Sequence, residues 1–174
     1  RRSLRRDCRI LLREARTTVV LVTHDPAEAL DIGDRIAVME AGRIVQFGTP
    51  AELHNAPATA AVGAIFSGAQ VIAGARAEVG LDTPFGLWPL ASLAGACPDV
   101  GALDLLVQAD RLTLVSDMRG CRVRDVHPLG PRARVLLEGA YGESVTVETA
   151  VPVDPAKFYS VIPDPESVRA FARE

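Results

Sequence analysis

The chain has 174 residues, of which 48% are hydrophobic and 24% are charged. This balance is typical of a globular protein and excludes a disordered one, and the length allows one ordinary domain or two small ones. The formal net charge of −3 gives no reason to expect nucleic acid or an anionic membrane surface as a partner.

The cysteines and the first residues set further expectations. Cys8, Cys97 and Cys121 lie far apart and are odd in number, so their spacing fits neither a disulfide framework nor a CxxC metal site. We expect no bound metal and reduced thiols in a cytosolic protein.

No apolar run approaches the roughly 20 residues of a membrane helix, and no signal peptide is present, so we expect no direct membrane insertion. Arg1 stands in place of Met within a helical pattern, which predicts a fragment.

The first elements predict an α/β arrangement. Residues 1–16 place apolar side chains on one helical face, and the acidic Asp7 and Glu14 interrupt the arginines, which favours a solvated face over a nucleic-acid patch. Residues 17–23, TTVVLVT, form a β-branched run without alternation, as in a strand buried inside a parallel sheet. His24 follows at once and is expected at the carboxyl end of that strand, where open α/β sheets bind ligands.

The next stretch carries clear helix and turn signals. Asp25 is a predicted N-cap, with Pro26 at the first helical position, and this helix should stop at Gly33. Residues 35–39 and 43–47 should form a hairpin. Thr49 repeats the capping arrangement for a short helix, and residues 59–66 predict another helix.

Beyond residue 68 the pattern changes to short alternating runs separated by Gly, Pro and Asp. Such spacing predicts a small β-barrel or sandwich, in which Phe85 and Trp88 are expected in the core. Residues 163–174 predict a short helix capped by Asp164. The predicted strands are residues 70–75, 77–81, 87–90, 103–108, 120–126, 132–137 and 144–149.

The string TTVVLVTHDPAEAL at 17–30, followed by DRIAVMEAGRIVQFGTPAEL at 34–53, resembles the switch-histidine segment, or H-loop, of ATP-binding cassette (ABC) transporter ATPases. That family reads VTHD-x-x-EA, then D-R-[IV]-x-V-[ML]-x-x-G-x-[IV], then G-T-P-x-E-[IL]. The positions that match are Val22, Thr23, His24, Asp25, Glu28, Ala29, Asp34, Arg35, Ile36, Val38, Met39, Gly42, Ile44, Gly48, Thr49, Pro50, Glu52 and Leu53.

The resemblance implies a catalytic role for His24. In the family this histidine reaches the γ-phosphate of ATP and helps to hold the attacking water and the opposing subunit. The chemistry needs a donor that stabilises charge at the γ-phosphate from a rigid position. Asp25 is expected to act as a helix cap, Asp34 and Arg35 to make local contacts, and His54 and His127 to face solvent, His127 in a loop before Pro128.

Other parts of the family's machinery do not occur in this sequence. It contains no GxxxxGK[ST] phosphate loop, no LSGGQ signature and no acidic Walker B strand. We therefore expect ATP and Mg²⁺ to serve the full-length protein, whereas these 174 residues alone should bind no ATP and be inactive.

The second half resembles the OB-like TOBE domain that often follows the ATPase domain of importers of iron, sulfate, sugars or polyamines. The resemblance rests on residues 80–90, 105–114 and 120–130, with Gln108, Ala109 and Asp110 where Arg-Pro-Glu is usual. It implies two domains: residues 1–67, the C-terminal part of a RecA-like nucleotide-binding domain, and residues 68–174, a TOBE domain. This second domain is expected either to stabilise the ATPase dimer or to bind a solute or regulator.

Together these features predict the C-terminal portion of the energy-coupling subunit of an ABC importer, with a slight preference for the ferric-iron class from residues 10–25. The implied partners are a second copy of the subunit and transmembrane permeases, with no nucleic acid. The implied location is the cytoplasmic face of the plasma membrane, through the permease. The alternative is a non-catalytic dimerisation or regulatory module from a truncated or split gene.

Overall fold

The structure is a computed structural model that describes residues 2–173, with side chains from residue 7 onward. The chain divides into two compact units, Arg1–Ser67 and Gly68–Glu174. It is a mixed α/β protein whose strands pair in antiparallel ladders. In the part of the chain that the structure describes, no helix has both the length and the apolar character needed to cross a bilayer.

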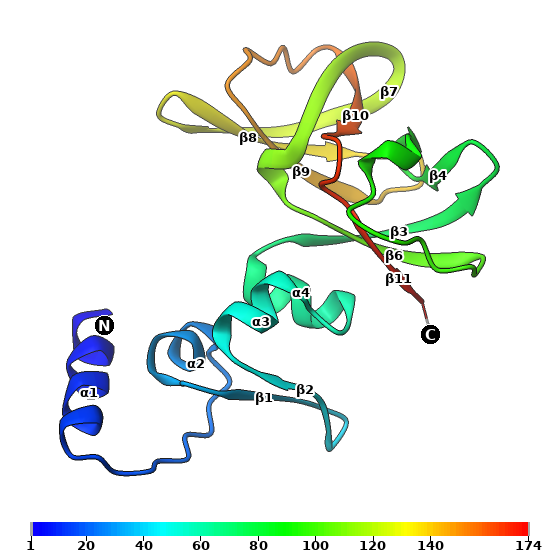
Figure 1. Cartoon of the computed structure of the whole chain (residues 1–174). Helices are drawn as coiled ribbons and strands as arrows, with labels where there is room; N and C mark the ends of the chain where they lie inside the picture. Colours follow the sequence, from blue (N-terminus) through cyan, green and yellow to red (C-terminus); the bar gives the residue numbers. More distant parts are fainter. Residues whose placement is uncertain (1, 174) are drawn as a thin grey trace. The chain divides into compact units, whose positions relative to one another are not determined.

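In the residues that the structure describes, the first unit consists of four helices and one hairpin. Its elements are α1 (Arg2–Glu14), α2 (Pro26–Ile32), β1 (Ile36–Glu40), β2 (Arg43–Gly48), α3 (Pro50–Asn55) and α4 (Ala60–Ser67) (Figure 1). The predicted helices and hairpin are confirmed, with ends within a few residues of those expected. A small core of Ile36, Leu53, Val62 and Phe66 holds the hairpin and the last two helices together.

The helix starts follow from local hydrogen bonds. The Asp25 carboxylate accepts a hydrogen bond from the Ala27 backbone N–H at 2.9 Å and so caps α2. At α3 the capping box is complete, because the Thr49 hydroxyl accepts from the Glu52 N–H and the Glu52 carboxylate accepts from the Thr49 N–H. The β1–β2 turn uses Ala41 and Gly42, both at positive φ.

The strand expected at residues 17–23 does not form. These residues run as an unpaired segment between α1 and α2 (Figure 1), and Val20 and Val22 are 88% and 91% exposed. The physical reason is that a strand needs neighbours to accept its backbone hydrogen bonds, and no described strand lies alongside this segment. The prediction of a strand inside a parallel sheet is therefore wrong for this structure.

The second unit is built from two antiparallel sheets. One has the order β11-β6-β3-β4-β5 and the other β10-β7-β8-β9. A parallel bridge between Leu93 and Val168 lies outside these ladders. The strands are β3 (Gln70–Ala77), β4 (Gly80–Thr83), β5 (Gly86–Trp88), β6 (Ala102–Val107), β7 (Leu112–Leu129), β8 (Arg132–Glu138), β9 (Ser144–Thr149), β10 (Phe158–Pro163) and β11 (Arg169–Ala172), with two short 3₁₀ turns, η1 (Leu90–Ser92) and η2 (Ala109–Arg111).

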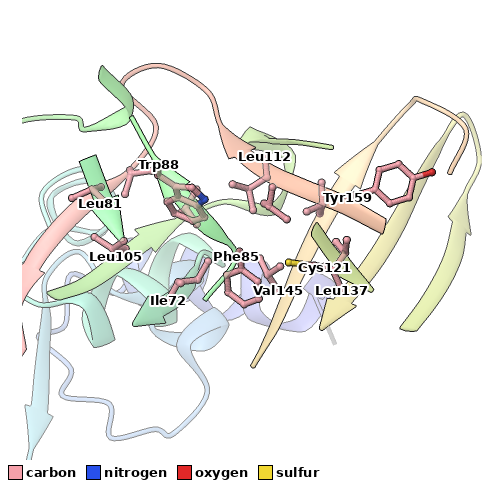
Figure 2. Close-up of a cluster of buried hydrophobic side chains, with 14 of the residues drawn as sticks. Ile72, Leu81, Phe85, Trp88, Leu105, Leu112, Cys121, Leu137, Val145 and Tyr159 are labelled. Atoms are coloured by element: carbon pink, nitrogen blue, oxygen red, sulfur yellow. The ribbon is translucent and has the colours of Figure 1, made fainter. Parts of the chain in front are cut away.

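One continuous core fills this unit (Figure 2). Trp88 is fully buried and Phe85 is 4% exposed, which confirms that both are core residues. Leu105 from one sheet and Leu137 from the other belong to the same cluster and are both fully buried. The reciprocal hydrogen bonds between the Gln70 side chain and the Thr146 backbone also join β3 to β9.

Three expectations for the second unit are wrong. The chain end forms strand β11, because residues 169–172 pair with β6 instead of closing a helix after Asp164. Residues 77–81 span the turn at Glu78 and Val79 rather than one strand. The expected strand at 120–126 is the middle of the 18-residue β7, so His127 lies in a strand, opposite Arg134, and not in a loop.

Candidate functional site

His24 lies in a short turn that two neighbouring side chains fix. The Thr23 hydroxyl donates a hydrogen bond to the Glu28 carboxylate at 2.8 Å and accepts one from the Asp25 N–H at 3.0 Å. Together with the Asp25 cap, these bonds tie the end of the unpaired segment to the first turn of α2. His24 is thus held on a defined backbone, although the segment before it has no ladder partner.

The His24 side chain is exposed and lines a broad concavity within the first unit. This concavity has a volume of about 1020 Å³, and its walls come from α1, the unpaired segment, α2, β1, β2 and α4. No hydrogen bond joins the His24 imidazole to another described residue, so both ring nitrogens are available to a ligand. The lining is largely apolar, because the valines of the unpaired segment, Met39 and Phe47 contribute to it.

Asp34 links α1 to the segment before β1. Its carboxylate accepts a 2.7 Å hydrogen bond from Arg13 and lies 3.6 Å from Arg9. The hydrogen bond from Arg13, followed by the charge of the same guanidinium, holds the pKa of Asp34 below its ordinary value. Because Asp34 is well exposed, this ion pair positions α1 locally and adds little stability.

The remaining residues singled out in the sequence make local contacts. The Arg35 guanidinium lies 5.4 Å above the Phe47 ring centre. His54 is exposed, with its Nδ1 atom 3.3 Å from the Phe66 carbonyl oxygen, and His127 is exposed as well. Within the described residues, no group of three or more His, Cys, Asp or Glu side chains is arranged to hold a metal ion.

The sequence patterns did not reveal the contacts that hold the His24 turn. The Thr23–Glu28 bond joins residues five apart across the end of a predicted strand, and Arg13 and Asp34 are 21 residues apart. The one available signal was the presence of both Thr23 and Glu28 in the family motif, without any indication that they bond to each other.

Comparison with known proteins shows partial matches to importer subunits. The chain is 47% identical over 81 residues to an Fe(3+) ions import ATP-binding protein of Pseudomonas fluorescens, covering 47% of this chain and 23% of that protein. A sulfate/thiosulfate import ATP-binding protein of Chromobacterium violaceum is 40% identical over 110 residues, covering 63% of this chain and 30% of the relative. A spermidine/putrescine import ATP-binding protein of Acidothermus cellulolyticus is 42% identical over 79 residues, covering 45% and 21%.

No family model matches the chain. Its curated homologues nevertheless include ATP-binding subunits of ABC importers for different solutes, as the sequence resemblance predicted. The chain spans only about a fifth to a third of the length of the three relatives described above.

Proposed function

We propose that this chain is the C-terminal portion of the ATP-hydrolysing, energy-coupling subunit of an ABC importer. The observation that carries the proposal is the identity of 40–47% with three importer ATP-binding proteins, together with the ordered motif around His24. The solute is a small one, with ferric iron as one candidate. In this proposal residues 1–67 end a RecA-like nucleotide-binding domain, and residues 68–174 form an OB-like TOBE domain.

His24 is the proposed catalytic residue, which contacts the γ-phosphate of ATP. Its imidazole is exposed, and the Thr23, Asp25 and Glu28 hydrogen bonds hold its backbone. A donor fixed in this way can stabilise charge that develops on the γ-phosphate without reorganising during the reaction. ATP and Mg²⁺ would bind to the complete subunit, with the phosphate loop and the Mg²⁺ ligands supplied by segments that these 174 residues do not contain.

The exposed segment 17–23 supports the assignment of the first unit to a larger sheet. Exposed valines in a β-branched run leave apolar surface and backbone hydrogen-bonding groups in water, and neighbouring parallel strands would cover both. We propose that other strands of the subunit take that place. His24 would then follow directly on a central strand, at its carboxyl end.

The proposed partners follow from the same assignment. Two copies of the subunit would close over ATP and drive a pair of transmembrane permease subunits. The subunit would lie in the cytoplasm, at the inner face of the plasma membrane, held there through the permease. The second unit would either support the dimer or bind a solute or regulator.

A chimera tests the role of His24. The part of the Chromobacterium violaceum relative that runs from the start of the matched region to its C-terminus is replaced by these 174 residues, and ATPase turnover and nucleotide affinity are measured. We expect a working ATPase in which His24→Ala lowers turnover about a hundredfold or more and leaves the nucleotide Kd unchanged. His127→Ala, an exposed histidine of the second unit, is the matched control.

Two outcomes would count against the proposal. The assignment of His24 fails if His24→Ala and His127→Ala leave the same turnover. The proposed function fails if the chimera binds nucleotide with the parent's affinity but does not hydrolyse it. Calorimetry on the 174-residue chain alone should show no saturable ATP binding, and a micromolar Kd would favour a separate nucleotide-binding module instead.

A further inference from the structure

A second concavity lies entirely within the β unit. It has a volume of about 500 Å³ and lies between the β4–β5 turn, a bulge in β7, the end of β8 and the outer face of β10. We call it the bulge pocket. Its lining combines apolar side chains with Asp117, Arg119, Arg122 and Glu138. Neither the ATPase motif nor the proposed function makes use of any of these residues.

The bulge results from a change of register between two strands. Tyr159 of β10 pairs with Ser116 of β7, whereas the preceding Phe158 pairs with Arg122. The five residues 117–121 of β7 therefore have no partner in β10 and form a bulge between two consecutive pairs of the ladder. Bulges of this kind redirect side chains, and here the bulge carries Arg119 and brings Arg122 to the pocket.

Specific contacts hold the bulge in place. The Asp117 carboxylate accepts a 2.6 Å hydrogen bond from the Ser160 hydroxyl and a 3.0 Å bond from the Arg119 backbone N–H. These bonds, the one from Ser160 first, lower the pKa of Asp117, which is therefore ionised at neutral pH. A Cβ at Gly120 would lie 2.3 Å from the Tyr159 carbonyl carbon, so the backbones are in direct contact. The pocket wall is thus preformed, which reduces the entropy lost on binding.

The floor of the pocket is apolar and uncharged. Phe85 and Cys121, both labelled in Figure 2, belong to the buried core and are 4% and 5% exposed. Burial raises the pKa of the Cys121 thiol, so it stays neutral at physiological pH. Leu87 and Phe158 also line the pocket and remain about half exposed, which leaves apolar surface for a ligand to cover.

Two guanidinium groups of the pocket are not engaged in hydrogen bonds with the described residues. Arg124 donates a 2.8 Å hydrogen bond to Glu138, and this ion pair lowers the pKa of Glu138. Neither the Arg119 nor the Arg122 guanidinium hydrogen-bonds to another described residue, although each lies near enough to a carboxylate to lower its pKa. Two arginines and two carboxylates line the pocket, so their formal charges balance, and Arg124 outside the lining pairs with Glu138. The Arg119 and Arg122 guanidinium groups are still able to donate.

We propose that the bulge pocket binds a small organic anion, with its carboxylate on Arg122 and Arg119 and its apolar group against Phe85, Leu87 and Phe158. Small-molecule sites combine a mostly apolar wall with a few convergent polar groups in this way. The inference does not depend on the ATPase assignment, because every residue involved lies in the second unit.

The test is an NMR titration of the ¹⁵N-labelled 174-residue chain with benzoate as the probe and benzyl alcohol as its neutral analogue. We expect saturable shifts of the backbone amides of Gly120, Cys121 and Gly139 with benzoate, and affinity at least tenfold weaker for benzyl alcohol. Arg122→Ala should weaken benzoate binding about tenfold. Arg132→Ala, which removes an exposed arginine of β8 outside the pocket, is the matched control and should leave the affinity unchanged.

Three results would overturn the proposal. The first is the absence of saturable shifts at these amides up to millimolar benzoate. The second is equal affinity for benzyl alcohol, which would show that the arginines do not select an anion. The third is equal weakening by Arg122→Ala and Arg132→Ala, which would show only a general effect of charge. Each variant's amide spectrum also establishes that its fold is retained.

Discussion

The two compact units differ in the extent to which they bury apolar side chains. The β unit has an extensive core, in which Leu103, Leu105, Val135 and Leu137 are all fully inaccessible to solvent, although surface residues such as Met118 remain exposed. The first unit keeps a small core but exposes Val20 and Val22 almost completely. Composition does not explain the difference, because both units are rich in β-branched and aliphatic residues. The difference lies in whether each apolar segment has a neighbouring strand to pair with.

An apolar, strand-like pattern therefore predicts a strand only where another strand is available to pair with it. In the β unit each alternating run finds a neighbouring strand within the same unit, so hydrogen bonding and burial are satisfied together. Residues 17–23 have the stronger apolar pattern but no described neighbour to pair with.

The largest expected effect is in the core of the β unit. Leu137→Ala should lower the free energy of unfolding by about 2–5 kcal/mol, because it leaves a cavity in a fully buried cluster. Urea denaturation followed by tryptophan fluorescence measures this change in one unit alone, since Trp88 is the only tryptophan and is buried there. A loss below 0.5 kcal/mol would contradict the close packing of this core.

A smaller loss is expected at the β7 bulge. Gly120→Ala should cost about 1–3 kcal/mol, because its Cβ would overlap the backbone of Tyr159 and the strands would have to separate. Gly101→Ala is the matched control, since a Cβ there has no atom within 4 Å and the position does not have positive φ. The same denaturation experiment compares them, and equal stabilities would show that the strands do not approach as closely as described.

In the first unit, the expected effect of a single substitution is about 1 kcal/mol. Thr49→Ala removes the hydroxyl of the capping box and should destabilise α3 by roughly that amount. Hydrogen exchange at the Leu53 amide, which bonds to the Thr49 carbonyl, measures local opening directly. Thr59→Ala, which removes another local hydroxyl–backbone bond at the start of α4, should leave exchange at Leu53 unchanged.

The same cap predicts a response to acid. Hydrogen bonds from Thr49, the backbone N–H first, lower the pKa of Glu52 below its ordinary value of 4.5. The stabilisation is therefore present above pH 4.5 and is lost as the pH falls through the lower folded-state pKa. A carboxyl-carbon NMR titration should give a midpoint below 4.5. In Glu52→Gln, the acid-induced rise in Leu53 exchange should disappear, and its persistence would assign the effect to another group.

The smallest effect on stability is expected in the unpaired segment. The double substitution Val20→Ser and Val22→Ser should change the unfolding free energy of the chain by less than about 0.5 kcal/mol, because both side chains are already in water. It should also reduce self-association, measured by light scattering, since exposed apolar strands promote aggregation. A loss of 2 kcal/mol or more would show that the segment is buried in the 174-residue chain.

Local signals in the sequence determined much of the first unit. Asp25 and Thr49 start their helices through bonds to residues two and three positions away, and the β1–β2 hairpin closes over a two-residue turn. Such contacts span few residues, so the identities at those positions are sufficient to predict them. The burial of Trp88 and Phe85 was also predictable, because large aromatic rings within alternating strands pack into the core.

Strand pairing and the bulge pocket depend on residues far apart in the sequence, and only the tertiary arrangement brings these residues together. Residues 17–23 remained unpaired and residues 169–172 became a strand because strand formation depends on whether another segment lies alongside. The bulge pocket likewise depends on the register shift between β7 and β10, which no pattern in the sequence predicted. Nearby residues specify the caps, the turns and the motif around His24. Long-range strand pairing selects which apolar segments are buried, since a backbone hydrogen bond in a sheet requires a second strand.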